Sequence, residues 1–313
     1  MRTRSLILLL TAGSLATACS HLDQNTQQWL DPDKTFARLD QPTIDGMNAT
    51  LEKQAIEATQ AGEYQKAGQY YKQLSETPKA TDDEKFRYKL GMAESARRAG
   101  HPEIAVPIYE QLVKEHPDHL DAQEDYGIAL MQTGKTVDAG RIFADIMKQD
   151  AKRWRTLNAL GILFVNKNMI PEAMAYFTEA LKQSADNPAI LNNVALAQAA
   201  DRQYARAFDS FEQALRVSGT DLQRKQISLN MAMVYGISGD LDTARDVASK
   251  YLSGPALDNN LGLYAHLAKD DALARTYLDM ALSGSPTFYE RAWNNLDIVE
   301  QKKDPNSGGA GAQ

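Results

Sequence analysis

The sequence predicts an all-α protein in which about seven helical hairpins stack into a solenoid and a final helix caps the stack. Three observations predict this fold class. An alanine recurs at intervals close to 34 residues, a small residue stands twelve positions before each of these alanines, and an aromatic residue usually stands four positions after it. Self-similarity with a period of tens of residues is typical of proteins built from stacked repeats.

The recurring alanines set the register of the repeats. They are Ala67, Ala105, Ala139, Ala173, Ala207, Ala244 and Ala274. The small residues twelve positions earlier are Ala55, Ala93, Gly127, Gly161, Ala195, Ala232 and Gly262. The residues four positions later are Tyr71, Tyr109, Phe143, Phe177, Phe211, Ala248 and Leu278. Three consecutive intervals of 34 residues, with the small residue kept in every repeat, are not expected by chance.

Each residue type in this register has a physical reason. Two antiparallel helices approach closely only where their side chains are small, so glycine or alanine recurs at the crossing. The aromatic side chain one turn further on fills the wedge between neighbouring helices. The pattern resembles the tetratricopeptide repeat, and this resemblance implies a superhelix of helix pairs whose first helices line a concave groove.

Residues 1–18 have the layout of a secretory signal peptide. Arg2 and Arg4 precede an apolar segment, residues 5–15, and small residues follow it. The apolar segment is shorter than the roughly 20 residues that a transmembrane helix needs, so a retained membrane-spanning anchor is the weaker alternative.

The small residues lead directly into Cys19, the only cysteine of the sequence. The stretch Leu15-Ala16-Thr17-Ala18-Cys19 resembles the bacterial lipobox, which implies cleavage before Cys19 and lipidation of its thiol. The alternative is an ordinary signal peptide followed by an incidental cysteine. Several acyl chains anchor a protein stably in a membrane. By the same resemblance, Ser20 implies transfer to the outer membrane, where the protein would face the periplasm.

Composition divides the rest of the chain into three parts. Residues 19–46 are rich in Gln, Asp, Asn and Pro and show no sustained period, so we expect a flexible, lipid-anchored tether. Residues 47–303 hold the repeats and the capping helix. Residues 304–313 are rich in glycine, and we expect them to form a disordered tail.

Glycines mark the predicted turn inside several hairpins. Gly62, Gly100, Gly134 and Gly239 stand where a first helix should end, and a helix C-terminus favours a residue that tolerates a positive φ. Gly134-Lys135-Thr136 also resembles the end of a phosphate-binding loop. That motif needs a glycine where the chain has Ala129, and it follows a strand, whereas a helix is predicted here. We therefore interpret the glycine as a turn residue.

The C-terminal repeats depart from the pattern. In the sixth repeat Ala248 replaces the aromatic residue, and Ser253-Gly254-Pro255 ends the hairpin early, so we expect a local change in superhelix pitch. After the seventh repeat one apolar stripe predicts a helix that caps the open end of the solenoid. Its residues are Tyr289, Ala292, Trp293, Leu296 and Val299.

The composition argues against several classes of function. A formal net charge of −7 opposes binding to nucleic acid, and one cysteine allows neither an intramolecular disulfide nor a cysteine-rich metal site. The histidines are scattered, and the pair His116 and His119 stands in a predicted turn. No Ser/His/Asp arrangement is suggested by spacing. We expect no enzymatic activity, and therefore no catalytic residue, metal, cofactor or small-molecule substrate.

Three asparagines are candidates for peptide binding. Asn193, Asn230 and Asn260 each stand two positions before the small residue of a first helix, on the face predicted to line the groove. An amide side chain offers both a donor and an acceptor, so a row of amides can hold the backbone of an extended peptide. The alternative is an ordinary polar surface.

The C-terminal part of the chain resembles the TadD lipoproteins of the tight-adherence (Flp-type) pilus assembly system. The likeness lies in residues 259–265 (NNLGLYA), 272–278 (ALARTYL) and 285–293 (SPTFYERAW). It implies an outer-membrane lipoprotein with a pilotin-like role, which helps the secretin of the pilus to assemble. The alternative is a scaffold that organises cell-wall enzymes or another envelope complex. An enzyme with a helical accessory domain is disfavoured, since the sequence predicts no domain besides the repeats.

Overall fold

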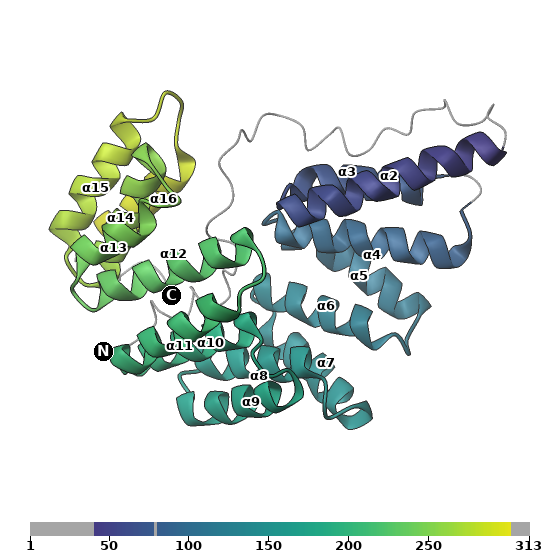
Figure 1. Ribbon diagram of the computed structural model, residues 1–313, viewed down its shortest axis with the longest axis horizontal. Coiled ribbons are helices and arrows are strands. Elements are labelled where there is room, and N and C mark those ends of the chain that lie inside the picture. Colours follow the sequence, from purple (N-terminus) through teal and green to yellow (C-terminus); the bar gives the residue numbers. More distant parts are fainter. Residues whose placement is uncertain (1–40, 78–79, 302–313) are drawn as a thin grey trace, which may run out of the picture. The chain divides into compact units, whose positions relative to one another are not determined.

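The computed structural model describes residues 41–77 and 80–301, and within these ranges it holds fifteen helices, α2 to α16, and no strand (Figure 1). The first helices of the hairpins are α2 (Gln41–Ala61), α4 (Asp82–Arg98), α6 (Leu120–Gln132), α8 (Trp154–Asn166), α10 (Pro188–Ala200), α12 (Asp221–Ile237) and α14 (Gly254–Leu267). The second helices are α3 (Tyr64–Ser75), α5 (Pro102–Glu115), α7 (Thr136–Gln149), α9 (Ile170–Gln183), α11 (Tyr204–Val217), α13 (Leu241–Ala248) and α15 (Asp271–Ser283). The helix α16 (Glu290–Gln301) follows them. Seven hairpins and a final helix confirm the predicted fold class.

The described helices belong to two compact units. The N-terminal unit comprises residues 41–167 and 175–184, and the C-terminal unit comprises residues 168–174 and 185–301. The helix α2 begins at Gln41, so residues 41–46, which we expected in the tether, are helical. The predicted signal peptide, Cys19 and the remainder of the predicted tether lie outside the described residues, as do residues 302–313.

The packing inside each hairpin follows the predicted register. All seven alanines of the second helices are 0% exposed. A Cβ atom on Gly127 would lie 2.5 Å from Cε1 of Phe143, and a Cβ atom on Gly161 would lie 2.5 Å from Cε1 of Phe177. In these two hairpins the ring of the second helix therefore occupies the space that a larger residue on the first helix would need.

The turns inside the hairpins contain residues with a left-handed backbone. The four predicted glycines have positive φ angles: Gly62 (77°), Gly100 (94°), Gly134 (80°) and Gly239 (99°). The remaining three hairpins use other residues at this place: Asn168 (59°), Arg202 (60°) and Lys269 (72°). The glycine prediction is confirmed, and the chain also accepts this conformation in residues that carry a Cβ atom.

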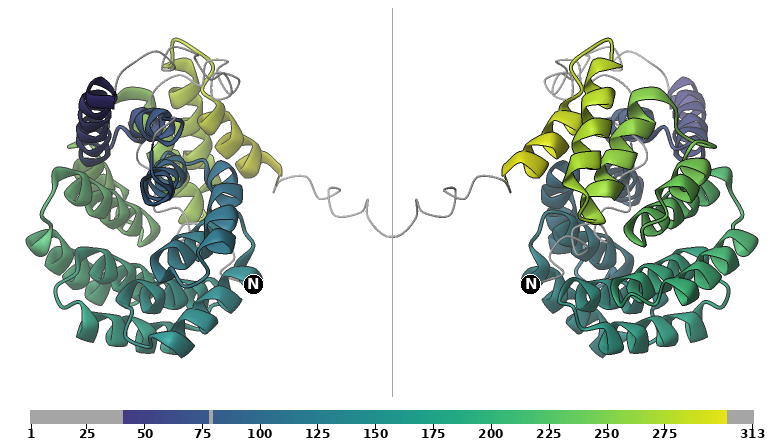
Figure 2. Two further views of the ribbon diagram at one scale, coloured as in Figure 1. Left: turned by 90° about the vertical axis from the view of Figure 1, so that its right-hand side faces the viewer. Right: turned by 90° about the vertical axis from the view of Figure 1, so that its left-hand side faces the viewer.

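The C-terminal unit shows the early end of the sixth hairpin and the final helix that the sequence predicted. The helix α13 has only eight residues, whereas α11 and α15 have 14 and 13. The helices α14, α15 and α16 lie side by side (Figures 1 and 2). In α16, Ala292 and Val299 are buried, and Leu296 packs against Ala265 and Leu278. Trp293, which we expected in this stripe, is 54% exposed, because it lies one position past the line of buried residues.

Enlarging the small residue at a hairpin crossing should destabilise the protein. We expect Gly127→Ala to lower the free energy of unfolding by about 2 kcal/mol, because the new Cβ atom displaces the buried Phe143 ring. Gly140→Ala is the matched control, since its Cβ atom would meet only Leu163 Cδ1, at 3.9 Å. Urea denaturation of both variants measures the difference, and equal midpoints would contradict the packing argument.

Candidate protein-binding surface and inter-repeat contacts

Two of the three predicted asparagines are joined through a neighbour. The Asn230 amide nitrogen of α12 donates a hydrogen bond of 2.9 Å to the Asn192 amide oxygen of α10. The Asn192 nitrogen donates in turn to the Asn193 oxygen, at 3.4 Å. Asn192 is buried, whereas Asn193 and Asn230 are half-buried. Asn193 and Asn230 thus lie on successive first helices, with Asn192 bonded to both.

Asn260 is held within its own helix. Its nitrogen donates to the Ala256 carbonyl oxygen at 2.7 Å, and its oxygen accepts from the Tyr264 hydroxyl at 3.4 Å. The same hydroxyl lies 3.3 Å from the Leu229 carbonyl oxygen of α12. Burial raises the pKa of Tyr264, so the hydroxyl stays protonated and able to donate. Asn260 thus bonds to residues of its own helix, and the peptide-binding role of all three asparagines remains a prediction.

A second set of polar residues was not anticipated, and it occupies one position of the register. Glu52, Glu124, Asn192 and Asn259 each stand three positions before the small residue of their first helix. Each accepts a hydrogen bond from, or forms an ion pair with, a side chain of the next first helix or, for Asn259, of α16. We call these four contacts the inter-repeat clasps. In the sequence, the adjacent asparagines Asn192-Asn193 and Asn259-Asn260 were the feature from which two of these four contacts could have been suspected.

Three of the clasps consist of a single pair. Arg87 Nη2 of α4 lies 3.1 Å from Glu52 Oε1 of α2. Asn230 bonds to Asn192 as described above. In the third, the Asn295 nitrogen of α16 donates to the Asn259 oxygen of α14 at 2.9 Å. Asn259 is 2% exposed, so this bond satisfies a buried amide and fixes the last helix against the seventh hairpin.

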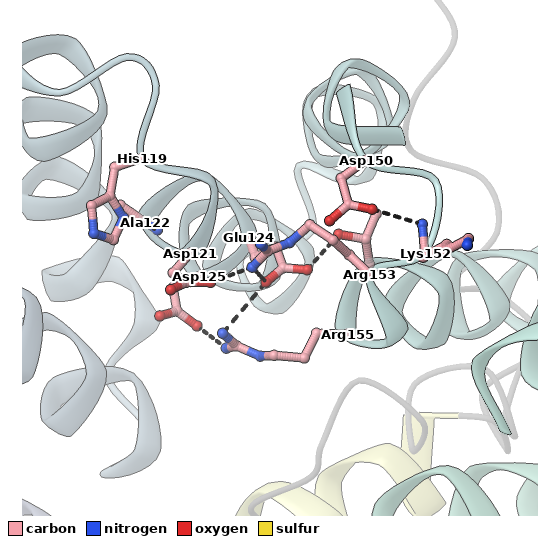
Figure 3. Close-up of polar contacts among 10 residues, drawn as sticks. His119, Asp121, Ala122, Glu124, Asp125, Asp150, Lys152, Arg153 and Arg155 are labelled. Carbon is pink, nitrogen blue, oxygen red and sulfur yellow. Dashed lines mark hydrogen bonds and ion pairs between the residues drawn. The ribbon is translucent and has the colours of Figure 1, made fainter. Parts of the chain in front are cut away.

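The clasp at Glu124 is the most extensive (Figure 3). Glu124 is 0% exposed, and its two oxygens accept from Arg153 Nη2 and Thr156 Oγ1, each at 2.6 Å. Arg155 Nη1 lies 3.5 Å from Glu124 Oε2. Arg153 also pairs with Asp121, and Arg155 with Asp125. Two guanidinium groups from the start of α8 thus face three carboxylates of α6.

Burial and pairing shift the pKa values of three groups in this cluster. Hydrogen bonding to Glu124 raises the pKa of Arg153 above its usual value. Burial raises the pKa of Asp125, although the nearby Arg155 opposes the shift. Burial alone would lower the pKa of Arg155, but the neighbouring Asp125 and Glu124 raise it. Because the charged groups pair with one another, we interpret the cluster as a structural contact between repeats.

The histidine pair and the glycine-lysine motif both have structural roles. His119 Nδ1 accepts a hydrogen bond of 3.2 Å from the Ala122 amide and so caps α6. The Phe86 ring packs against His116 and His119, with centroid distances of 4.3 and 4.7 Å. Lys135 stands at the start of α7, directly after the turn at Gly134.

The described residues hold neither a metal-ligand cluster nor a membrane-spanning helix. No group of three or more His, Cys, Asp or Glu side chains within residues 41–77 and 80–301 is placed to hold a metal ion. None of the helices in these ranges is long and apolar enough to cross a membrane.

Removing the central carboxylate of the Glu124 clasp should destabilise the N-terminal unit. Glu124→Gln keeps the side-chain size but removes the buried charge that Arg153 and Arg155 share, so we expect a loss of about 2 kcal/mol. Asp138→Asn is the control, because its pair with Arg141 is exposed and contributes about 0.3 kcal/mol. Thermal denaturation compares the two variants. Similar small losses in both would show that the clasp does not hold the repeats together.

Comparisons with known proteins agree with this architecture. The sequence pattern of the tetratricopeptide repeat matches residues 90–152 and 158–221. A tetratricopeptide repeat protein of Parabacteroides merdae is similar over 81% of this chain and 98% of its own, with 14% identity and a TM-score of 0.52. One from Thermus thermophilus is similar over 63% and 99%, with 17% identity and a TM-score of 0.50. A chain of the APC/C Cut9–Hcn1 assembly matches 81% of this chain with 16% identity and a TM-score of 0.55, and 49% of that chain is covered. A search of curated proteins finds no match. The register, the hairpins and these likenesses together show that the described residues have the tetratricopeptide repeat fold.

Proposed function

We propose that this protein is a lipid-anchored scaffold that binds other proteins and has no catalytic activity. The single observation that carries the binding function is the arrangement of amides on α10 and α12. Asn193 and Asn230 are half-buried, and hydrogen bonds to the buried Asn192 fix them in place. Side chains that are already ordered lose little entropy when a partner binds, and amides can pair with any peptide backbone.

The proposed anchor is a lipid on Cys19. The support is the sequence of residues 15–19, which resembles a lipobox, and the signal-peptide layout before it. Acylation of the thiol would hold the protein at a membrane. Ser20 favours the periplasmic face of the outer membrane, since the resemblance associates aspartate at this place with the inner membrane.

The proposed client is the secretin of a tight-adherence pilus, which the protein would help to assemble in the manner of a pilotin. The support is the likeness of three segments to TadD lipoproteins. These segments fall in α14 (residues 259–265), in α15 (272–278) and in the stretch from the end of α15 into α16 (285–293). All three belong to the C-terminal unit, which also carries the candidate asparagines.

Anchoring and secretin assembly can be tested together in a deletion strain. We expect the strain to lose heat-resistant secretin multimers in its outer membrane, and the wild-type gene to restore them.

Cys19→Ala should lose labelling by a palmitate analogue and leave the membrane fraction, because no other residue carries a thiol. Ser20→Asp is the control, which should keep the label and move to the inner membrane. Normal multimers in the deletion strain would contradict the secretin role, and an unlabelled wild-type protein would contradict the anchor.

The asparagine hypothesis predicts a loss of binding without a loss of fold. We expect Asn230→Ala combined with Asn260→Ala to weaken secretin retention in a pulldown by about tenfold, as for a truncated contact of more than 1 kcal/mol. Asn294→Ala, on the exposed side of α16, is the matched control. Because Asn230→Ala also leaves Asn192 without a donor, melting curves must accompany the binding data. A double variant that melts normally and binds with unchanged affinity would rule out this role for the asparagines.

A further inference from the structure

Two register positions of the first helices change from charged to uncharged residues along the chain. They stand six and two positions before the small residue, so the side chains at both share one face of the helix. In α4, α6 and α8 this face carries Arg87, Asp121, Asp125 and Arg155. In α10, α12 and α14 it carries only alanine, asparagine and glutamine, at Ala189, Asn193, Gln226, Asn230, Ala256 and Asn260.

The part of this face on α10 and α12 is accessible. Ala189 is exposed, and Asn193, Gln226 and Asn230 are half-buried. The two helices meet here, because the Asn230 nitrogen donates to the oxygen of Asn192, the residue before Asn193. We call Ala189, Asn193, Gln226 and Asn230 the neutral surface.

Neither helix supplies a charge on the neutral surface. All 13 residues of α10 are uncharged, and the three charged residues of α12 precede Gln226. Two of them, Asp221 and Arg224, form an ion pair of 2.8 Å. The third, Lys225, lies about 140° around the helix axis from Asn230 and so on another face.

The carboxylate of α14 also lies off this face. Asp258 stands two residues from both Ala256 and Asn260, which places it on the opposite side of the helix. Burial raises the pKa of Asp258, and the charge of Arg245 on α13 opposes the shift. This carboxylate therefore lies toward the second helix of the preceding hairpin.

A charged segment would be poorly held at the neutral surface. A charge that leaves water needs an opposite charge or several hydrogen bonds to offset its lost hydration. A peptide backbone carries no charge, and an asparagine amide can pair with its N–H and C=O groups. Within the described residues Asn230 uses one N–H, toward Asn192, which leaves its oxygen and its second N–H for a ligand.

We propose that the neutral surface selects an uncharged, extended segment of the partner protein. The Asn230 amide would hold the backbone of this segment, and its side chains beside α10 and α12 would be Gly, Ala, Ser, Thr, Asn or Gln. This class of segment refines the binding function proposed above and rests on it.

Site-specific photo-crosslinking in the full-length, anchored protein identifies the segment. A benzophenone amino acid replaces Ala189, and in a matched control it replaces Ala205, which is exposed on α11 of the same unit. We expect the probe at position 189 to crosslink another protein, and the probe at position 205 not to. Mass spectrometry of the crosslinked peptide should show a segment without Asp, Glu, Lys or Arg around the site of attachment.

Charges placed on the neutral surface should weaken the contact whatever their sign. Asn230→Asp and Asn230→Lys should each lower the crosslink yield by about tenfold, because either charge loses hydration without gaining a counter-charge. Asn230→Gln keeps a neutral amide and should retain most of the yield. Gln213→Asp and Gln213→Lys, on the exposed side of α11, are the matched controls. Melting curves of every variant establish that the hairpins remain folded.

Ionic strength provides a second measurement that needs no further variant. The yield from position 189 should change by less than about twofold between low and high NaCl concentration, because salt weakens only contacts between charges. A basic or acidic segment would instead be released at high salt, and Asn230→Asp and Asn230→Lys would then change the yield in opposite directions. Either result would overturn the proposal. A crosslink to lipid, to a second copy of this chain or to residues 20–40 of the same chain would also overturn it, as would a yield no higher than that from position 205.

The outcomes separate the neutral surface from the proposed function. If position 189 crosslinks a charged segment of the secretin, the scaffold function stands and the selection of an uncharged segment fails. If the deletion strain assembles secretin normally while position 189 crosslinks an uncharged segment of another protein, the secretin role fails and the neutral surface stands.

Discussion

Every hairpin of this protein depends on a small residue at the point where its two helices cross. The rings of Phe143 and Phe177 occupy the volume that a Cβ atom on Gly127 or Gly161 would need, at 2.5 Å from the nearest ring carbon. This contact fixes the rotation of both helices about their axes. Once the rotation is fixed, each of the remaining positions along the first helix has a defined neighbour. Counting positions from the small residue therefore describes the packing, the polar contacts and the exposure of the side chains.

The inter-repeat clasps follow from this fixed register. In four hairpins a polar residue three positions before the small residue meets the next first helix or, after the seventh hairpin, α16, and it is a carboxylate or an amide. In the N-terminal unit the clasps use charge, with Glu52 and Glu124 facing arginines. In the C-terminal unit they use neutral amides, with Asn192 and Asn259. The chemistry differs, but Glu124, Asn192 and Asn259 share one requirement, because a buried polar group needs a partner.

The sequence was sufficient to predict what depends on local spacing. The buried alanines, the small residues and the left-handed glycines all recur at fixed intervals, and the structure confirms them. The clasps could not be predicted as pairs, because Arg153 and Glu124 are 29 residues apart and meet only after the hairpins stack. The exposure of Trp293 was also missed, since an apolar stripe does not show which of its margins another helix covers. The lipid on Cys19 and the binding role of Asn193, Asn230 and Asn260 remain predictions.

The short helix α13 has a consequence for local opening of the structure. In an array of repeats, stability is a sum of the intrinsic stability of each unit and of its coupling to its neighbours. Eight residues give α13 little more than two turns, so the sixth hairpin contributes less of both than the hairpins beside it. We therefore expect cooperativity to fall at this hairpin, so that the backbone amides of α13 exchange with solvent by a local opening.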